Sequence, residues 1–366
     1  MDTLLHPRAN IRGNLLIRVQ SLEKPKITSF FSSEKLSEAE TTVRLDAYHC
    51  KYIKRHLLAP DSPRVDLKSY EAFCKNYESE HAALLLHNRP MVPFLLYLEK
   101  IVSQDKFIKF RADKLFEADI ICHAKVLIKV MMLHGNFGES FGLLATKYKG
   151  NIYITRRTKS HEFRKETIKA VARHALFSDH PNSDKNTQEP YGAKFHCVFD
   201  WKLCDASVML FSGVQGVNSD TEITMDTDPR NIQVARIKTK FKGSNERQHA
   251  SYQSPYWWCQ SYLLGNDDIH VVNIDEDDSV ECINTIGLDT FLRDYEKHWK
   301  KSSDERISFL RLVMDLIKLR MTFVNCPLTV YEFYAIGENT IHYNVHSGRS
   351  KFTFLTDQYV NAIKEL

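Results

Sequence analysis

The longest regular pattern in this chain is a helical one, and a strand pattern follows it almost at once. Apolar side chains recur at helical spacing from Ser303 to Val324, and Pro327 ends the pattern. Residues 329–336, which read Thr-Val-Tyr-Glu-Phe-Tyr-Ala-Ile, are rich in β-branched and aromatic side chains, as strands are. A helix with one apolar face needs a layer to pack against. We therefore predict a mixed α+β fold.

Shorter patterns account for other parts of the chain. The apolar runs 15–19, 27–31 and 126–132 are read as strands, and Lys149-Gly150-Asn151 as a hairpin turn. Residues 178–189 carry no large apolar side chain, so we predict a mobile surface loop there. Because no repeat or linker-like segment divides the chain, we predict one domain over residues 1–366.

Composition narrows the class of protein. Of the 366 residues, 43% are apolar and 26% are charged, which excludes a collagen-like or fully disordered chain. No apolar run approaches the ~18–20 residues that span a bilayer, and the N-terminal residues lack a signal-peptide core, so we expect no membrane partner. The cysteines are scattered without a Cys-x-x-Cys pair, which favours reduced thiols in the nucleus or cytosol.

Positive charge is concentrated in two segments. The net charge of +4 is too small to indicate a nucleic-acid partner by itself. Residues 141–174, however, hold nine Lys or Arg against two Glu, and residues 230–247 hold six against one. Aromatic residues lie close by, among them Tyr252, Tyr256, Trp257 and Trp258. Cations next to stacking aromatics favour contact with single-stranded nucleic acid, although a solvated surface is the alternative for either segment alone.

Four short pieces, in chain order, carry a family resemblance. They are Phe110-Arg111-Ala112, Tyr191-Gly192-Ala193-Lys194-Phe195-His196, the segment from Glu222 to Thr239, and Trp257-Trp258-Cys259-Gln260-Ser261-Tyr262-Leu263-Leu264-Gly265. Together they resemble the decapping exoribonuclease (DXO) family, whose members act on the 5′ ends of incompletely capped or uncapped RNA. The last piece is nearly the family's Trp-Trp-Ala-Gln-Ser-Phe-Leu-x-Gly. The resemblance implies a single large domain of two packed mixed β-sheets flanked by helices.

The resemblance also implies a metal-dependent site whose acids are largely replaced here. Family members hold one or two Mg²⁺ through carboxylates, and a lysine orients the attacking water. In this chain His196 stands where the first acid lies, and Arg236 stands at the glutamate of the family's Glu-x-Lys, with Lys238 retained. A cation in place of an anionic ligand repels Mg²⁺. We therefore predict a pseudo-enzyme with no metal, no cofactor and no catalytic residue.

The family's Glu-x-Asp piece can be aligned in two ways. Aligned on Glu222-Ile223-Thr224, it keeps the glutamate and has Thr224 in place of the aspartate; aligned on Asp226-Thr227-Asp228, it is displaced. At most two carboxylates therefore remain at the predicted site.

Other matched positions predict contact with RNA instead. The resemblance places Arg111, Lys238 and Gln260 along the family's RNA phosphate path, and Arg236 adds a cation that suits a 5′ phosphate. For Arg111 a surface arginine is the alternative, and for Gln260 a buried amide that joins two elements. The predicted RNA-binding residues are Arg111, Arg156, Arg157, Arg236, Lys238 and Gln260.

Within the family, this replacement of acids is similar to that in a catalytically degenerate branch, which works in a nuclear, chromatin-bound complex with Rhino and Deadlock at germline piRNA source loci. That resemblance implies localisation in the nucleus and Rhino–Deadlock complex components as partners. It also implies that the protein protects RNA 5′ ends from decapping and degradation and suppresses termination and splicing. Two alternatives stay open. One is an active metal-dependent RNA 5′-end pyrophosphohydrolase or exoribonuclease with a site rebuilt from Glu222, Asp226 and Asp228. The other is a protein-interaction module with a vestigial cleft.

Overall fold

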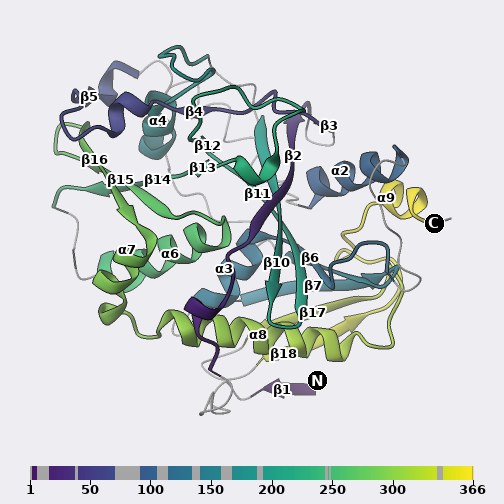
Figure 1. Ribbon diagram of the computed structural model, residues 1–366. Helices are drawn as coiled ribbons and strands as arrows, with labels where there is room; N and C mark the ends of the chain where they lie inside the picture. The colour runs from purple at the N-terminus through teal and green to yellow at the C-terminus, as the bar shows by residue number, and fades with distance from the viewer. Residues whose placement is uncertain are drawn as a thin grey trace.

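In the computed structural model of the protein, strands from both halves of the chain join in one large sheet (Figure 1). The structure describes residues 2–5, 16–37, 40–70, 91–104, 114–133, 141–157, 167–187, 193–243, 246, 249–335, 341–364 and 366. Within these ranges the large sheet has ten strands, in the spatial order β1 (Asp2–Leu5), β18 (Ile341–His346), β17 (Val330–Ala335), β7 (Phe141–Tyr148), β8 (Asn151–Arg156), β6 (Ile120–His123), β11 (Ala206–Gly213), β10 (Lys194–Leu203), β2 (Lys26–Lys35) and β3 (Thr41–Arg44).

The large sheet is mixed, because β6 runs parallel to both of its neighbours, β11 and β8. The next pair, β7 and β8, is an antiparallel hairpin. Lys149 and Gly150 at its turn both have positive φ, 48° and 75°. Two consecutive positive φ values define the tight turn whose twist matches that of the flanking strands.

Two smaller sheets in the described part of the chain have four strands each, and both are also mixed. One has the order β13 (Val234–Ala235), β12 (Gly216–Val217), β4 (Tyr52–Ile53) and β9 (Phe177–Ser178). The other has the order β14 (Ile237–Phe241), β15 (Asp268–Ile274), β16 (Ser279–Gly287) and β5 (Val65–Asp66). Since β13 and β14 are nearly continuous in sequence, the chain passes directly from one small sheet to the other at Arg236.

Helices pack on both faces of the large sheet. Along β10, Phe195, Cys197 and Phe199 belong to one apolar cluster and Val198 to a second, as the two-residue period of a strand requires. The first cluster includes residues of α3, α6 and α8, and the second includes residues of α2 and α9. The helices are α2 (Val92–Ser103), α3 (Ala124–Leu133), α4 (Thr167–Leu176), α6 (Ser254–Leu263), α7 (Leu288–Tyr295), α8 (Ser303–Arg320) and α9 (Asp357–Ala362), with short turns η1 (Val19–Ser21), η2 (Arg55–Leu58), η3 (Leu67–Tyr70), η5 (Pro229–Asn231), η6 (His249–Gln253) and η7 (Glu296–His298).

The start of α8 is fixed by its sequence. The Ser302 hydroxyl accepts a hydrogen bond from the Glu305 amide, and the Glu305 carboxylate accepts one from the Ser302 amide at 2.9 Å. This capping box satisfies two amides that the first helical turn leaves without partners. Figure 1 shows α8 running across the lower part of the molecule, below the ends of β10 and β11.

The mixed α+β fold is confirmed, as are the strand at 27–31, the hairpin at Lys149-Gly150 and the helix that begins at Ser303. The strand predicted at 126–132 is wrong, because this run lies in α3, a helix whose residues are buried almost all round. An apolar run without polar positions has no period, so it fits a buried helix as well as a strand. The strand predicted at 15–19 is wrong for the residues that the structure describes, since Val19 begins η1.

The number of sheets also differs from the prediction. Where two sheets were expected, the described strands form three. The single domain and the mobile loop at 178–189 stay predictions. No described helix has the length and apolar character that crossing a membrane requires.

Candidate functional site

Three of the segments singled out in the sequence meet where strands of the large sheet end. His196, near the start of β10, lies between Gly213 of β11 and Phe31 of β2 in the strand register. After Gly213 the chain continues beside β10, since the Val214 amide donates a hydrogen bond to the Phe195 carbonyl at 3.0 Å. It then pairs Gly216 with Ala235, the residue before Arg236. Residues 213–217 therefore connect the His196 position to the Arg236 position.

The side chain of His196 is held as a neutral, packed ring. It is 4% exposed, and its Nε2 lies 2.8 Å from the Ser33 hydroxyl. Burial, with smaller contributions from the charges of Lys194, His49 and Lys125, lowers the pKa of His196 to about 3. The imidazole is therefore uncharged at neutral pH.

The charges that lower the pKa of His196 and of His123 are those of cations. Burial lowers the pKa of His123, at the end of β6, well below its usual value, and the charges of Lys125, Lys194 and Arg236 lower it further. The charges of these three side chains therefore act on the His123 ring. The result is a positively charged site with two neutral imidazoles in it.

Lys238, two residues after Arg236, contacts Gln260. The Lys238 ammonium on β14 donates a hydrogen bond to Oε1 of Gln260 on α6, and both side chains are about 95% buried. The side chain of Gln215 accepts a hydrogen bond from the Ile237 amide at 2.8 Å. Gln260 is thus a buried amide that joins a helix to a strand, and a role toward RNA stays a prediction for both residues.

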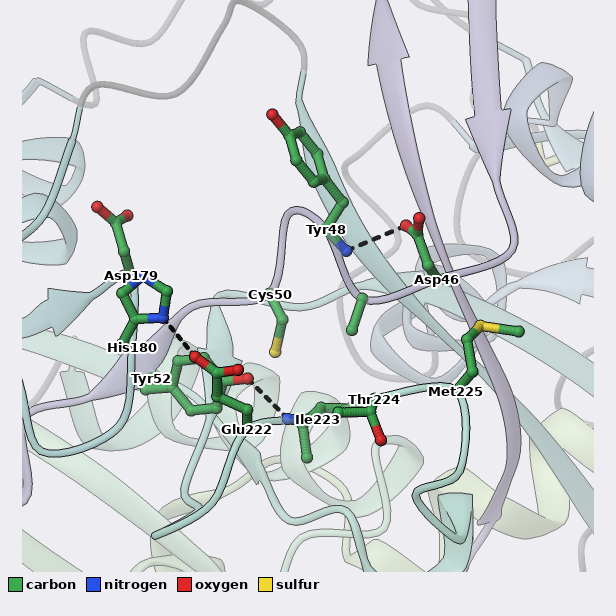
Figure 2. Close-up of a pocket in the computed structure, with 11 residues that line it drawn as sticks. Asp46, Tyr48, Cys50, Tyr52, Asp179, His180, Glu222, Ile223, Thr224 and Met225 are labelled. Carbon is green, nitrogen blue, oxygen red and sulfur yellow. Dashed lines mark hydrogen bonds and ion pairs between the residues drawn. The ribbon is translucent and has the colours of Figure 1, made fainter.

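The segment from Glu222 to Asp228 lies on a separate loop. Figure 2 shows the Glu222 carboxylate turned toward the His180 ring, and Oε1 of Glu222 lies 2.6 Å from Nδ1 of His180. The Thr224 amide donates to the Thr227 hydroxyl, and the Asp228 carboxylate accepts from the Arg230 amide and guanidinium. Glu222 and Thr224 line a cavity of about 360 Å³, together with Asp46, Ala47, Tyr48, Cys50, Tyr52, Asp179, His180, Ile223 and Met225.

The outer basic residues lie at the same edge of the sheet as His123. Because β6 and β8 run parallel, with Cys122 opposite Ile154, the Arg156 at the end of β8 follows at that edge. Arg156 and Arg157 are both exposed. The Arg157 guanidinium forms an ion pair with the buried Glu332 carboxylate, which leaves less of its charge for an external ligand. Arg111 lies outside the described residues.

The side chains of this site do not suit a divalent cation. Mg²⁺ and Ca²⁺ take oxygen ligands, several of them anionic. The side chains assigned to this site are imidazoles, ammonium groups, a guanidinium and an amide. Within the part of the chain that the structure describes, no three His, Cys, Asp or Glu residues are grouped as metal ligands.

Sequence reasoning missed several of these residues. It left the third piece aligned on either Glu222 or Asp226, whereas the register places Val214, Gln215 and Gly216 beside the His196 strand. A signal was present: two strand-like runs flank the turn at Cys204-Asp205 directly after the Tyr191–His196 piece, and the second run ends at Gly213. His123, Lys125 and Lys194 were also missed, because the strand order that assembles them is not visible in the sequence.

Comparisons with known proteins agree with this fold. A family model described as "RAI1 like PD-(D/E)XK nuclease" matches residues 23–360. Protein cutoff of Drosophila melanogaster is 22% identical over 282 residues, which are 72% of this chain and 72% of that protein. Rai1 of Scheffersomyces stipitis, solved with (3′-NADP)+ and calcium ion, aligns with a TM-score of 0.73 at 14% identity and covers 100% of both chains. Rai1 of Candida albicans, solved with pU5-Mn2+, aligns with a TM-score of 0.67 at 12% identity over 94% of this chain and 96% of that one.

Proposed function

The chain belongs to the RAI1-like PD-(D/E)XK nuclease family, and from this premise we propose that it is a catalytically inactive member that binds RNA 5′ ends. One observation carries the proposal: His196 is a buried neutral ring, residues 213–217 connect its position to that of Arg236, and the charges of Lys125 and Lys194 act on it. Metal-dependent hydrolysis of a phosphate ester relies on cations held by carboxylates to neutralise developing charge. Protein cations in their place bind phosphate but bring no activated water.

A 5′ monophosphate is the ligand that this charge favours. Arg236 offers the planar donor set that matches phosphate oxygens, and the lysines add point charges. His196 stays neutral, so it neither repels the cations nor serves as an acid at neutral pH. A bound 5′ end would then be shielded from decapping and degrading enzymes.

Similarity to Protein cutoff supports a cellular setting for this activity. We place the protein in the nucleus, as a subunit of a chromatin-bound complex with Rhino–Deadlock components. There it protects nascent transcripts and suppresses termination and splicing at piRNA source loci. Co-purification of the full chain with Rhino and Deadlock tests this setting, and absence of both from the purified chromatin fraction would contradict it.

The biochemical proposal is tested by fluorescence anisotropy. Matched RNAs with a 5′ monophosphate or a 5′ hydroxyl are compared, with and without Mg²⁺, at stated salt. We expect tighter binding of the phosphorylated RNA, independent of Mg²⁺ and without product. Arg236→Ala should remove the preference, worth about 1–3 kcal/mol for a charge-assisted hydrogen bond. Lys202→Ala, an exposed strand lysine at the other end of β10, is the matched control.

A further inference from the structure

A row of cations runs along one face of the strand that leaves the site. Arg236, Lys238, Lys240 and Lys242 occupy every second position from the start of β14 to just beyond its end. Alternate residues of a strand share a face. Ile237, between the first two, belongs to the apolar cluster on the other side. Exposure rises along the row, from buried Lys238 through half-buried Lys240 to exposed Lys242.

Two exposed tyrosines precede Gln260 on the helix that Lys238 contacts, and the three residues form a second row. Tyr252, Tyr256 and Gln260 are spaced by four residues from η6 into α6, so they lie near one helix face. Tyr252 is 41% exposed and Tyr256 is 38% exposed, whereas Gln260 is buried. The exposed end of this row includes a π-helical turn, a feature that is frequent at functional sites.

Two contacts indicate that the strand and the helix run in opposite directions. At the inner end Lys238 binds Gln260. At the outer end Lys240 forms an ion pair with Glu246 at 3.6 Å and lowers the pKa of His249, after burial as the larger cause. As β14 leads away from Arg236, the neighbouring residues therefore fall progressively earlier in α6 and η6, where the two tyrosines lie. The side chain of Glu246 is 85% exposed.

The two rows also advance by similar steps. Alternate strand residues are about 6.6 Å apart, and four residues of α-helix rise about 6 Å. A polymer with one negative charge and one planar ring per repeat unit can match both rows at once. Single-stranded nucleic acid has that repeat, with phosphates that bind cations and bases that stack on aromatic rings without regard to sequence.

We infer that Lys240 and Lys242 with Tyr252 and Tyr256 form a track for the RNA strand that leads away from the 5′ end. The inference rests on the proposed function for its starting point, the 5′ phosphate near Arg236. It adds a contact surface for the nucleotides that follow, with phosphates along β14 and bases on the tyrosines. Because stacking tolerates every base, the track binds RNA without sequence preference.

Length-dependent binding tests the track. The probes are a 5′-phosphorylated oligoadenylate dinucleotide and octanucleotide, each also made with a 5′ hydroxyl, and binding is measured by fluorescence anisotropy. We expect the octanucleotide to bind more tightly than the dinucleotide. Replacing one tyrosine, Tyr256→Ala, should weaken octanucleotide binding about 5- to 150-fold, the equivalent of ~1–3 kcal/mol for one stacked base. Dinucleotide binding should not change. Tyr256→Phe, which keeps the stacking ring, should bind as the unmodified protein does, and Tyr48→Ala, an exposed tyrosine elsewhere, is the second control.

Each outcome decides a different question. A gain with length that survives both Tyr252→Ala/Tyr256→Ala and Lys240→Ala/Lys242→Ala overturns the track and leaves 5′-end binding intact. Equal binding of both oligonucleotides by the unmodified protein also contradicts the track, and would instead favour a protein partner for this surface. If the dinucleotide shows no preference for a 5′ phosphate but the gain with length is lost in the tyrosine variant, the proposed function fails and the track stands.

Discussion

The imidazole of His196 lies parallel to the ring of Phe31, with the ring centroids 4.5 Å apart and the planes 6° apart. Phe31 stacks in turn on Tyr97 at 4.5 Å. A histidine in such a stack packs as an aromatic ring inside the apolar layer between the sheet and α2. The His196 side chain is therefore held by ring packing and by the Ser33 hydroxyl at Nε2, while its buried Nδ1 has no hydrogen-bond partner among the described residues.

Stability should fall in mild acid because of His196. The unfolded chain takes up a proton at this residue near pH 6.5, whereas the folded protein does not until about pH 3. Between these values the unfolded state binds more protons, so the free energy of unfolding falls as the pH falls. We expect His196→Gln to reduce this slope by up to about 1.4 kcal/mol per pH unit. Urea unfolding at a series of pH values measures it, and identical slopes in both proteins would contradict a buried neutral ring.

Restoring acids should restore affinity for a divalent ion. His196→Glu and Arg236→Glu together replace a neutral ring and a cation with two carboxylates. We expect Mn²⁺ affinity, measured by calorimetry, to rise at least about tenfold, or ~1.4 kcal/mol. Activity should not return in full, since ligand geometry needs supporting hydrogen bonds. Lys202→Glu controls for charge alone, and Mn²⁺ binding by the unmodified protein as tight as in the double variant would refute the site assignment.

Gly216 should not tolerate a side chain. A Cβ at this position would lie 2.5 Å from the Phe177 ring and 2.6 Å from the Lys51 carbonyl oxygen. Gly216→Ala should therefore destabilise the protein by about 1–3 kcal/mol. Gly213→Ala, three residues earlier, meets the His196 ring at an ordinary 3.5 Å and should be nearly neutral. Thermal unfolding compares the two, and equal melting temperatures would show that residues 213–217 follow another path.

Arg156 and Arg157 should respond differently although they are adjacent. Arg157→Ala leaves the 5% exposed Glu332 carboxylate with His346 as its remaining described partner, and we expect a loss of about 1–2 kcal/mol in stability. Arg156→Ala should leave stability unchanged. If RNA phosphates reach this edge, Arg156→Ala should flatten the salt dependence of RNA binding by roughly 0.7 in log–log slope. An unchanged slope would remove Arg156 from the RNA-binding residues.

Local sequence patterns are sufficient to predict structure where the residues of one segment determine its conformation. The Lys149-Gly150 turn and the capping box before α8 depend on neighbouring residues, so both were predictable. The apolar run of α3 was misread because its surroundings, sheet on one side and α6 and α8 on another, determine that it is a helix. Burial on all sides removes the periodicity that sequence reading needs.

The site was only partly predictable for a related reason. His196, Arg236, Lys238 and Gln260 were found through short pieces of family resemblance. Val214, Gln215 and Gly216 were missed because strand register, which no single segment encodes, places them beside His196. Likewise His123 and Lys125 reach the site through the parallel pairing of β6 with β11, between segments about 90 residues apart.

The most direct test of the central claim is product formation from RNA. The full-length protein is incubated with 5′-monophosphate, 5′-triphosphate and unmethylated-cap RNAs in the presence of Mg²⁺ or Mn²⁺. A site that holds a neutral His196 and the cation Arg236 in place of acids predicts that every RNA is recovered intact. Metal-dependent release of nucleotides or caps that disappears in Glu222→Gln or Asp226→Asn would contradict the account and establish an active enzyme with a rebuilt site.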